Sequence, residues 1–411
     1  MHGGIDAHLL ALLGSTGRHG GAPPLCAAEW DALAGQAVRL GVAPLVHARL
    51  AQSGADWPVP ELVRQSLKAR YVRAGLENLR LLARLAALLP QLREAGIEVI
   101  VLKGAYLAQS VYGDPALRPM GDADLLVRQA DLDRAAALLR ADGWRERAAH
   151  ESTVPGGGGH QLPMFERGGV HLELHWAIED DASPFSIDGE GLWQRAVPAR
   201  INGAPTWALS PEDLLLHLCV HAAYGHGWRQ FDTGLRPLCD IAACLRRLGN
   251  RIDWGVLADR ARAWHIHPSV ELTLVLVRDL LGAAVPPWVL DRLAPPRIER
   301  AVVDAATALV LAQHYGDLAR HLPVLGRSWL TKRWHRLPAG ARWRAHALPS
   351  GEALARVYPS LDARMLRPLR YAAHWADLLN DVARVSFGRR GRSLVAQERR
   401  RMTVLRWLES V

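Results

Sequence analysis

The apolar residues of this chain change their spacing along its length, and those changes divide it into helical and β-rich parts. Residues 5–96 carry apolar side chains three and four positions apart, the spacing of an amphipathic helix, most clearly over residues 60–95. Pro60 lies near the expected start of this last helix and Gly96 just after its end, as is typical of helix boundaries. The pattern therefore predicts an N-terminal helical region.

Between residues 97 and 209 the spacing becomes that of a β-sheet. Short runs of β-branched residues are typical of buried strands, and alternating apolar and polar residues of half-covered ones. Gly168-Gly169 and Asn202-Gly203 fit the two-residue turns that join antiparallel strands. Four consecutive glycines from Gly156 cannot hold regular structure, so residues 151–159 are expected to form a mobile loop. We expect strands at residues 97–102, 122–128, 161–166 and 170–177, a hairpin over 197–209, and helices at 104–112 and 131–141.

Helical spacing returns at Ser210 and continues to the end of the chain. Ser210 and Pro211 fit the N-cap and the first position of a helix, and the two acids that follow suit its first turn. We expect helices at residues 211–223, 234–248, 253–265, 269–282 and 297–320. The chain then divides into an N-terminal helical region (1–96), a mixed α/β core (97–209), a helical domain (210–320) and a basic, mostly helical extension (321–411).

The composition agrees with folded domains and excludes several other classes of protein. With 411 residues, 49% of them hydrophobic and 22% charged, the chain is too apolar to be disordered and long enough for two or three domains. No apolar run reaches the ~20 residues of a membrane-spanning helix, and the N-terminus lacks the features of a secretory signal. Four cysteines without Cys-x-x-Cys spacing predict neither a disulfide framework nor a four-thiolate zinc site. We therefore expect a soluble, cytoplasmic protein.

Positive charge is concentrated at the C-terminal end of the chain. Residues 321–411 hold 18 Lys and Arg against 6 Asp and Glu, whereas the preceding 320 residues hold 32 against 35. A basic region of this kind could bind an anionic partner, such as nucleic acid, an anionic membrane surface or an acidic protein. The alternative is a solvated helical face in an arginine-rich chain, because 47 of the 50 basic residues are Arg. Lys103 is one of three lysines, which draws attention to the motif that contains it.

Two aspartates begin the strand expected at residues 122–128. Asp122 and Asp124 lie two positions apart, so their carboxylates point to the same face of a strand. Neighbouring carboxylates repel each other unless a cation lies between them, and Mg²⁺, which prefers oxygen ligands, is the usual cation. Upstream, Lys103 and Gly104 fall between a strand and a helix, where backbone N–H groups and the helix dipole can bind a phosphate group.

A later strand carries three polar residues on one face. His171, Glu173 and His175 alternate with apolar residues that face the other way. A third carboxylate on a strand next to Asp122 and Asp124 would complete a site for two metal ions, one at an acceptor oxygen and the other at a triphosphate. The same three polar residues also fit the zinc site of a hydrolase, or a polar ladder on the surface.

In the order in which they occur, these motifs resemble the uncharacterised bacterial nucleotidyltransferases of the DNA-polymerase-β-like superfamily. The resemblance covers about residues 97–285 and includes a strand–glycine–helix turn, an Asp-x-Asp strand and one acid on a later strand. It rests on Val101–Gly104, Tyr112, Arg118–Val127 and Glu173–Trp176, and continues through Ser210–Asp213, His221, Asp240-Ile241 and Ile252–Trp254.

The resemblance implies an α+β fold, in which a small mixed β-sheet forms the nucleotidyltransferase core between N-terminal helices and a large C-terminal helical region. It also implies transfer of a nucleoside monophosphate from an NTP, with ATP as the expected donor, to an acceptor, with release of pyrophosphate. The expected site residues are Asp122, Asp124 and Glu173 as catalytic ligands of Mg²⁺ (or Mn²⁺), Lys103, Gly104 and Arg118 at the phosphates, and His171, His175 and His160 as accessory residues.

The phosphate loop departs from the usual pattern of the superfamily. Lys103-Gly104 stands where Gly-Ser or Gly-Gly is usual, and the loop from Gly104 to Asp122 is longer than in minimal members. This difference favours a second hypothesis, a catalytically reduced module that binds a nucleotide or a partner. Arg118 has an alternative role as well, in an ion pair with Asp114. The sequence does not specify the acceptor, which could be a tRNA end, a peptide or protein, or a small metabolite.

Overall fold

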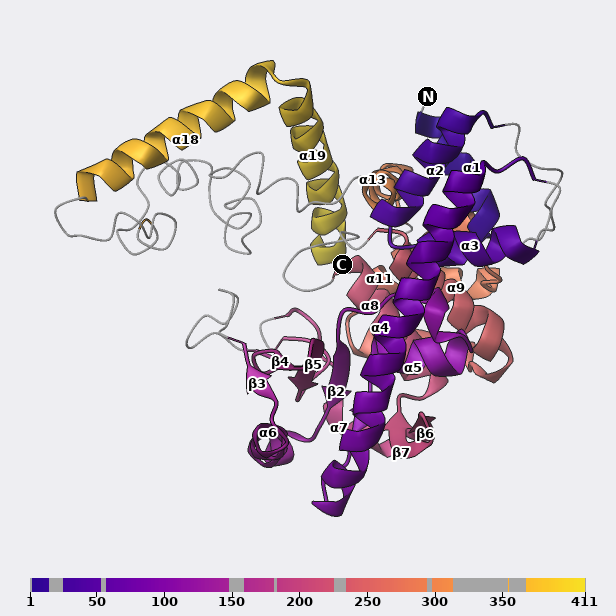
Figure 1. Cartoon of the computed structure of the whole chain (residues 1–411), viewed down its shortest axis with the longest axis vertical. Coiled ribbons are helices and arrows are strands. Elements are labelled where there is room, and N and C mark those ends of the chain that lie inside the picture. Colours follow the sequence, from indigo (N-terminus) through magenta and orange to yellow (C-terminus); the bar gives the residue numbers. More distant parts are fainter. Residues whose placement is uncertain are drawn as a thin grey trace. The chain divides into compact units, whose positions relative to one another are not determined.

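The computed structural model describes residues 2–14, 25–52, 57–147, 159–180, 183–224, 234–293, 298–312, 354 and 367–410. These residues fall into two compact units, and Figure 1 labels many of their elements. The first unit comprises Met1–Ala223 and Leu235–Ile298, and the second comprises Tyr224–Gly234 and Glu299–Val411. The glycine-rich segment that the sequence predicts to be a loop lies, except for Gly159, outside the described residues.

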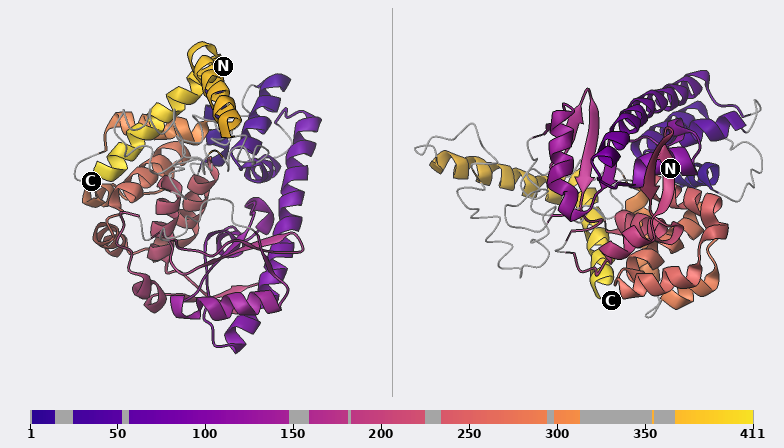
Figure 2. Two further views of the ribbon diagram at one scale, coloured as in Figure 1. Left: turned by 90° about the vertical axis from the view of Figure 1, so that its left-hand side faces the viewer. Right: turned by 90° about the horizontal axis from the view of Figure 1, so that it is seen from below.

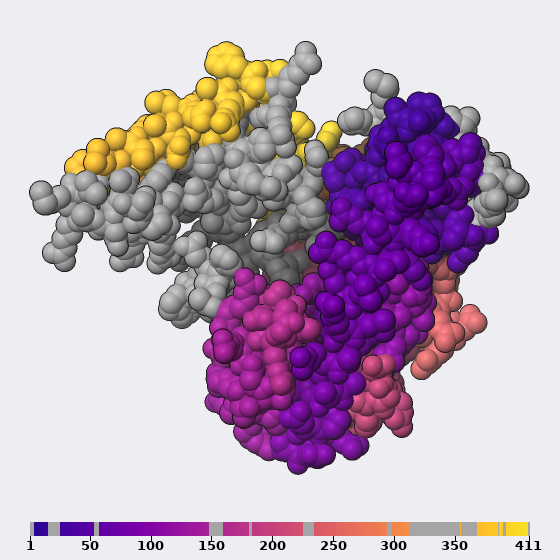
Figure 3. Space-filling view, in the orientation of Figure 1, coloured from indigo at the N-terminus to yellow at the C-terminus, as the bar shows by residue number. Residues whose placement is uncertain are grey.

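The N-terminal part of the first unit is helical, as its apolar spacing predicts. Its helices are α1 (His2–Leu13), α2 (Ala27–Arg39), α3 (Ala43–Gln52) and α4 (Glu61–Glu94). Pro60 precedes α4, and Gly96 follows it with a φ of +72°, so both expected ends of this helix are confirmed. Helix α4 extends from α2 and α3 to the sheet (Figure 2), and these segments form one continuous body in the space-filling view (Figure 3).

A mixed sheet follows α4. Within the described residues its strands are β1 (Ile100–Val101), β2 (Ala123–Leu126), β3 (Arg145–Glu146), β4 (Phe165–Arg167), β5 (Val170–His175), β6 (Val197–Ile201) and β7 (Ala204–Ala208). They lie in the order β3-β4-β5-β2-β1-β7-β6. β2 is parallel to β5 and β1 is parallel to β7, while the other neighbouring pairs are antiparallel. This sheet with its flanking helices confirms the expected α+β fold.

Two of the turns in the sheet follow directly from the sequence. Gly168 and Gly169 have φ values of +58° and +76°, and Asn202 and Gly203 have values of +48° and +87°. Positive φ at both positions of a two-residue turn matches the right-handed twist of antiparallel strands. The predicted β4–β5 and β6–β7 hairpins are therefore confirmed. The sequence pattern did not predict β3, because its two residues are both exposed and carry no apolar alternation.

The core of the α/β part lies between one face of the sheet and helices α4 and α6 (Leu132–Ala141). Two other helices of the α/β part are short. They are α5 (Lys103–Tyr106), which continues as a π-helix over Leu107–Val111, and α7 (Gly189–Gln194). The side chains that form this core are almost completely removed from solvent, and their burial holds the strands against the helices. They include Leu125, Phe165, Leu172 and Leu174 from the strands and Leu85, Leu92 and Leu139 from the helices.

The remaining helices of the first unit form a second helical part. They are α8 (Pro211–Ala223), α9 (Arg236–Leu248), α10 (Trp254–Ala263), α11 (His267–Leu281) and α12 (Pro287–Leu293). The first four confirm the helices expected from residue 211 to residue 282, whereas α12 was not predicted. Ten consecutive residues of α11, from Pro268 to Val277, are buried, as expected for a helix that is surrounded by others.

The described helices of the second unit are α13 (Arg300–Leu311), α18 (Arg367–Phe387) and α19 (Arg389–Ser410). Helix α19 packs against both of the others. Beyond residue 312, the helix expected at 297–320 lies outside the described residues. Among the helices that are described, none combines the length and the apolar character needed to cross a membrane. The four cysteines are free, and three of them are buried.

Candidate active site

The candidate site begins where the parallel strands β2 and β5 lie side by side. In their register Asp124 is opposite Glu173, and Leu125 is opposite Leu174. Both leucines are fully buried in the core beneath α4 and α6. Because successive side chains on a strand point to opposite faces, the two carboxylates project together from the other face of the sheet.

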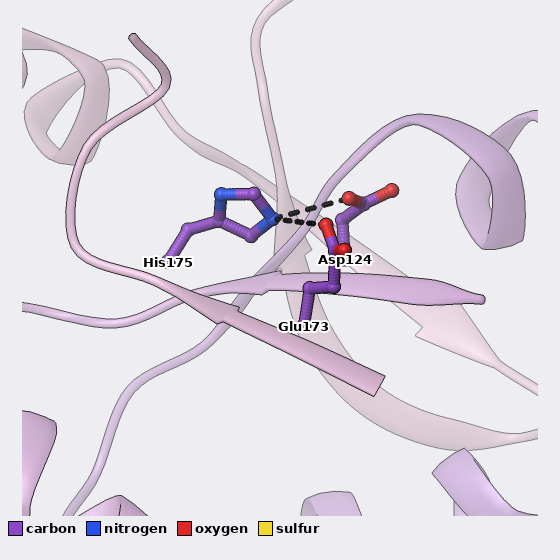
Figure 4. Close-up of side chains that lie close together, drawn as sticks. All are labelled: Asp124, Glu173 and His175. Atoms are coloured by element: carbon purple, nitrogen blue, oxygen red, sulfur yellow. Dashed lines mark hydrogen bonds and ion pairs between the residues drawn. The ribbon is translucent and has the colours of Figure 1, made fainter. Parts of the chain in front are cut away.

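His175 joins this pair from the end of β5, two residues after Glu173. Its Nε2 lies 3.1 Å from Asp124 Oδ1 and 3.5 Å from Glu173 Oε2. The three side chains point toward one another (Figure 4), and one potential ligand atom from each lies within 4.8 Å of the others. The part of the chain that the structure describes contains no second group of this kind.

Lys103 brings a positive charge to the same carboxylate. It begins α5 directly after Leu102, whose N–H donates to the backbone carbonyl of Asp124 over 3.0 Å. The Nζ of Lys103 lies 3.1 Å from Asp124 Oδ1, and both side chains are buried. The φ of Lys103 is +37°, a backbone conformation that residues other than glycine rarely adopt. Lys103 and His175 thus share one oxygen of Asp124.

The charges of these four side chains support one another. Burial opposes ionisation of Asp124, yet Lys103 and the hydrogen bond with His175 hold its pKa well below the usual range. Burial alone would lower the pKa values of Lys103 and His175, but Asp124 raises both. Burial likewise opposes ionisation of Glu173, and the hydrogen bond with His175 lowers its pKa. Asp124 and Glu173 are therefore carboxylates that are arranged to bind positive charge.

Asp122 lies just before β2 and is the third acid of the site. Burial, together with the charges of Asp124 and Glu173, raises the pKa of Asp122 to about 6. Its carboxylate does not belong to the close group formed by Asp124, Glu173 and His175. The structure thus brings Asp124 and Glu173 together, places Asp122 within electrostatic reach of both, and adds His175.

Arg118 is buried beside Gly104. Its Nε and Nη2 donate to both carboxylate oxygens of Asp240 over 2.9 to 3.1 Å. The alternative partner that the sequence suggested was Asp114, which instead caps a short 3₁₀ helix and accepts a hydrogen bond from Tyr71. A Cβ atom at Gly104 would lie 2.6 Å from Arg118 Nη1, so glycine is required for this close approach.

A comparison of the sequence with protein families identifies the family of the chain. The model of a family described as uncharacterised nucleotidyltransferases matches residues 27–282, more than half of the chain. The chain belongs to this nucleotidyltransferase family. The matched region runs from α2 to the end of α11, so it contains the sheet and the acidic cluster, whereas α13, α18 and α19 lie beyond it.

The other comparisons add solved structures but no curated relative. None of the curated proteins matches the chain. The antibiotic-resistance factor ANT(2'')-Ia is 14% identical, with a TM-score of 0.32 over 50% of this chain and 95% of that protein. An antigenic nucleotidyltransferase-like protein from Paracoccidioides brasiliensis is 17% identical, with a TM-score of 0.30 over 50% of this chain and 93% of that protein.

The other two expected histidines also lie at the site of this nucleotidyltransferase. Nδ1 of His171 is 3.3 Å from the carbonyl oxygen of Gly121, the residue before Asp122. The ring of His160 lies 5.5 Å from the ring of His175, measured between centroids. His171 is not part of the close ligand group, so the described residues do not form the His171, Glu173 and His175 set that a zinc hydrolase would need.

The residues that hold Arg118 in this nucleotidyltransferase were missed at the level of sequence. Tyr112 and Asp240 belong to the motifs that carry the family resemblance, but no role followed from their positions. In the structure Tyr112 Oη donates to Asp240 Oδ1 over 2.9 Å, and Asn78 Nδ2 donates to the carbonyl oxygens of Pro115 and Arg118 over 2.5 and 2.7 Å. The available signal was that Asp240 stands among apolar residues of a helix, where a buried charge needs a partner.

Proposed function

We propose that this chain is a Mg²⁺-dependent enzyme that transfers a nucleoside monophosphate from an NTP, with ATP as the expected donor, to an acceptor hydroxyl. The observation that carries this proposal is the register of β2 and β5, which sets Asp124 opposite Glu173 in a member of a nucleotidyltransferase family. Two ionised acids on adjacent strands, with a third acid just before one strand, form the kind of ligand set on which metal-assisted phosphoryl chemistry depends.

The donor groups of the cluster suit a divalent cation. Asp122, Asp124 and Glu173 would hold it through carboxylate oxygens, which Mg²⁺ and Mn²⁺ prefer. Lys103 Nζ and His175 Nε2 both lie 3.1 Å from Asp124 Oδ1, so this position attracts positive charge. When bound there, Mg²⁺ supplies Lewis-acid chemistry, which withdraws electrons from the reacting phosphate and offsets its negative charge.

The side chains of the site would bind and orient the reactants. Glu173, which His175 helps to keep ionised, would accept the proton of the acceptor hydroxyl as that oxygen forms a bond to the α-phosphorus of the NTP. The bond from the α-phosphorus to the oxygen bridging to the β-phosphate breaks, and pyrophosphate leaves with the electron pair. Lys103 and Arg118, the cations on either side of Gly104, would bind the phosphates.

Substitution of Asp124 tests the proposed reaction. Asp124→Asn keeps the shape of the side chain but removes a charged ligand, so we expect nucleotide transfer to fall by about 100-fold or more, equivalent to about 3 kcal/mol of lost transition-state stabilisation. Transfer is measured by intact mass of candidate acceptors and by pyrophosphate release from labelled ATP with Mg²⁺. The matched control is Asp133→Asn, at an exposed aspartate on α6. Equal transfer by the wild type and Asp124→Asn would reject the proposal.

A second candidate function is a module that binds a nucleotide or a partner without turnover. It is favoured by the Lys103-Gly104 sequence of the phosphate loop and by the salt bridge between Lys103 and Asp124, which places a side-chain cation where a metal ion would bind. Calorimetry with ATP and Mg²⁺, followed by the pyrophosphate-release assay, separates the two functions. Binding without release supports the module, and Asp124-dependent release supports the enzyme.

We also propose that the basic C-terminal region contacts an anionic acceptor. Helix α19 carries exposed arginines at Arg392, Arg399, Arg400 and Arg406. Each arginine that neutralises a phosphate of a nucleic-acid acceptor adds to the salt dependence of binding. Replacing Arg399 and Arg400 with Gln should therefore weaken acceptor binding and flatten its dependence on salt concentration, and an unchanged salt series would remove this role.

A further inference from the structure

A second arginine lies close to Arg118, and it comes from a different part of the chain. Arg236 begins α9, and its Nη1 donates to the carbonyl oxygen of Pro119 over 3.3 Å. Pro119 belongs to the segment that leads from Arg118 to Asp122. Arg236 therefore reaches the edge of the acidic site from the helical part of the first unit, outside the α/β core.

The two arginines differ in how their charges are balanced. Asp240 accepts hydrogen bonds from Nε and Nη2 of Arg118, so the charge of Arg118 has a buried counterion. Nε of Arg236 is buried and has no hydrogen-bond partner. Among the described residues, no carboxylate lies within ion-pair distance of the Arg236 guanidinium, whose recorded hydrogen bond goes to a backbone carbonyl. Arg236 is thus a partly buried cation that has no anion of its own among the described residues.

The surroundings of Arg236 make its charge costly. Burial and the nearby charge of Arg118 lower the pKa of Arg236, while Asp240 and Asp122 act more weakly in the opposite direction. A buried charge without a partner destabilises a protein, and two cations near each other add to that cost. Groups that are held in such an unfavourable state near a cluster of acids are often those that meet a charged ligand.

We propose that Arg236, together with Arg118, binds the terminal phosphates of the nucleotide, the part that leaves as pyrophosphate. This inference rests on the proposed function. Asp240 uses Nε and Nη2 of Arg118, whereas Nη1 lies against Gly104 at the start of α5. Arg118 lies four residues before Asp122, and Arg236, whose Nε has no partner, contacts Pro119 in the segment between them. Guanidinium N–H groups are well matched to phosphate oxygens.

A purely structural role for Arg236 predicts a different response to substitution. If its hydrogen bond to Pro119 served only to hold the loop, removal of the side chain would lower the stability of the protein and leave anion binding unchanged. A binding role predicts the reverse, because removal of an unpaired buried charge spares the fold or stabilises it and takes away a ligand of the phosphate.

Arg236→Met in the full-length chain tests this proposal, with inorganic pyrophosphate as the probe. Arg247→Met is the matched control, since Arg247 is an exposed arginine of the same helix. Calorimetry gives the affinity for pyrophosphate, and thermal unfolding gives the midpoint of each variant. We expect Arg236→Met to weaken pyrophosphate binding at least tenfold with an unchanged or higher midpoint, while Arg247→Met behaves as the wild type. Arg236→Lys keeps the charge but loses Nε, and should weaken binding at least threefold.

Equal affinity for pyrophosphate in the wild type and Arg236→Met overturns the inference, and so does a wild-type protein that does not bind pyrophosphate. In both cases Asp124-dependent transfer from ATP still shows whether the proposed function stands. An Arg236-dependent pyrophosphate site in a protein that transfers no nucleotide supports the inference and rejects the proposed enzyme. If Arg236→Met does not fold, Arg236→Lys decides, because wild-type affinity in that variant leaves Arg236 a structural role alone.

Discussion

Asp240 and Asp124 are both buried aspartates that lie beside a cationic side chain, but they bind it in different ways. Asp240 accepts hydrogen bonds from two nitrogens of Arg118 and from the hydroxyl of Tyr112, so both of its oxygens are used. Asp124 offers one oxygen, Oδ1, to Lys103 and to His175. A planar guanidinium fixes the geometry of a carboxylate, whereas an ammonium group is a point charge that another cation can replace.

This difference separates an ion pair that holds the fold from one that is suited to exchange. The pair of Arg118 and Asp240 joins the segment before β2 to α9, and its charges are matched one to one. Asp122 and Glu173 lie near Asp124, and burial together with the charges of Asp124 and Glu173 raises the pKa of Asp122. A surplus of acids over side-chain cations is expected where a metal ion binds.

The largest effect is expected from breaking the pair that holds the fold. Asp240→Ala leaves the charge of Arg118 buried without a counterion, and we expect a loss of about 3–5 kcal/mol in the free energy of unfolding. Urea unfolding followed by tryptophan fluorescence measures this change. The exposed Asp133 of α6 provides the control, since Asp133→Ala should change stability by less than about 0.5 kcal/mol.

A double variant sharpens the interpretation of Asp240. Arg118→Met combined with Asp240→Leu leaves no buried charge unpaired, so it should cost less stability than Asp240→Ala alone. If the single variant lost less than about 1 kcal/mol, the pair would not hold the fold. The contrast with Asp124 would then disappear.

A third buried acid, Glu271, has no ion-pair partner among the residues that the structure describes. Burial in α11 raises the pKa of Glu271 to about 7, although the N–H of Ile298 donates to it over 3.4 Å and acts in the opposite direction. Below the unfolded pKa of about 4.5 the group is protonated in both states and costs nothing. As pH rises from 4.5 to 7 the unfolded chain ionises first, so the folded state loses stability, in total about 3 kcal/mol.

Glu271→Gln tests this behaviour because glutamine is neutral and can still accept the hydrogen bond from Ile298. The variant should be more stable than the wild type by about 3 kcal/mol at pH 8 and equal to it near pH 4. Urea unfolding at several pH values measures the difference. A gain that does not depend on pH would show that burial of the charge is not its cause.

The sequence could predict which residues share a face of a strand, but not which strands become neighbours. Alternation placed Asp122 with Asp124 and His171 with Glu173 and His175, and the turn residues fixed both hairpins. The sequence analysis expected only that Glu173 lies on a strand near that of Asp122 and Asp124, and the parallel pairing of β2 with β5, which sets Asp124 opposite Glu173, is seen in the structure. Strand register depends on tertiary packing, and local spacing does not report it.

Contacts between distant segments were beyond the reach of the sequence pattern. Arg118 was expected to bind phosphate or to pair with Asp114, which is its neighbour in sequence. Asp240 is its actual partner, and Asp114 instead accepts hydrogen bonds from Tyr71 and from the backbone N–H of Ala116. Likewise, Lys103 was predicted to neutralise a triphosphate, and its salt bridge with Asp124 became visible only in the structure.

The smallest of these effects is expected at the exchangeable pair. Lys103→Met removes one charged hydrogen bond from Asp124 but leaves His175 in place, so without divalent ions it should cost about 2 kcal/mol of stability. If a metal ion can take the place of the ammonium group, millimolar Mg²⁺ should raise the unfolding midpoint of Lys103→Met more than that of the wild type. Lys68→Met, at an exposed lysine of α4, is the control and should respond to Mg²⁺ as the wild type does. Identical responses in all three proteins would mean that Lys103 and a metal ion do not compete for Asp124, and the distinction between this pair and that of Asp240 would fail.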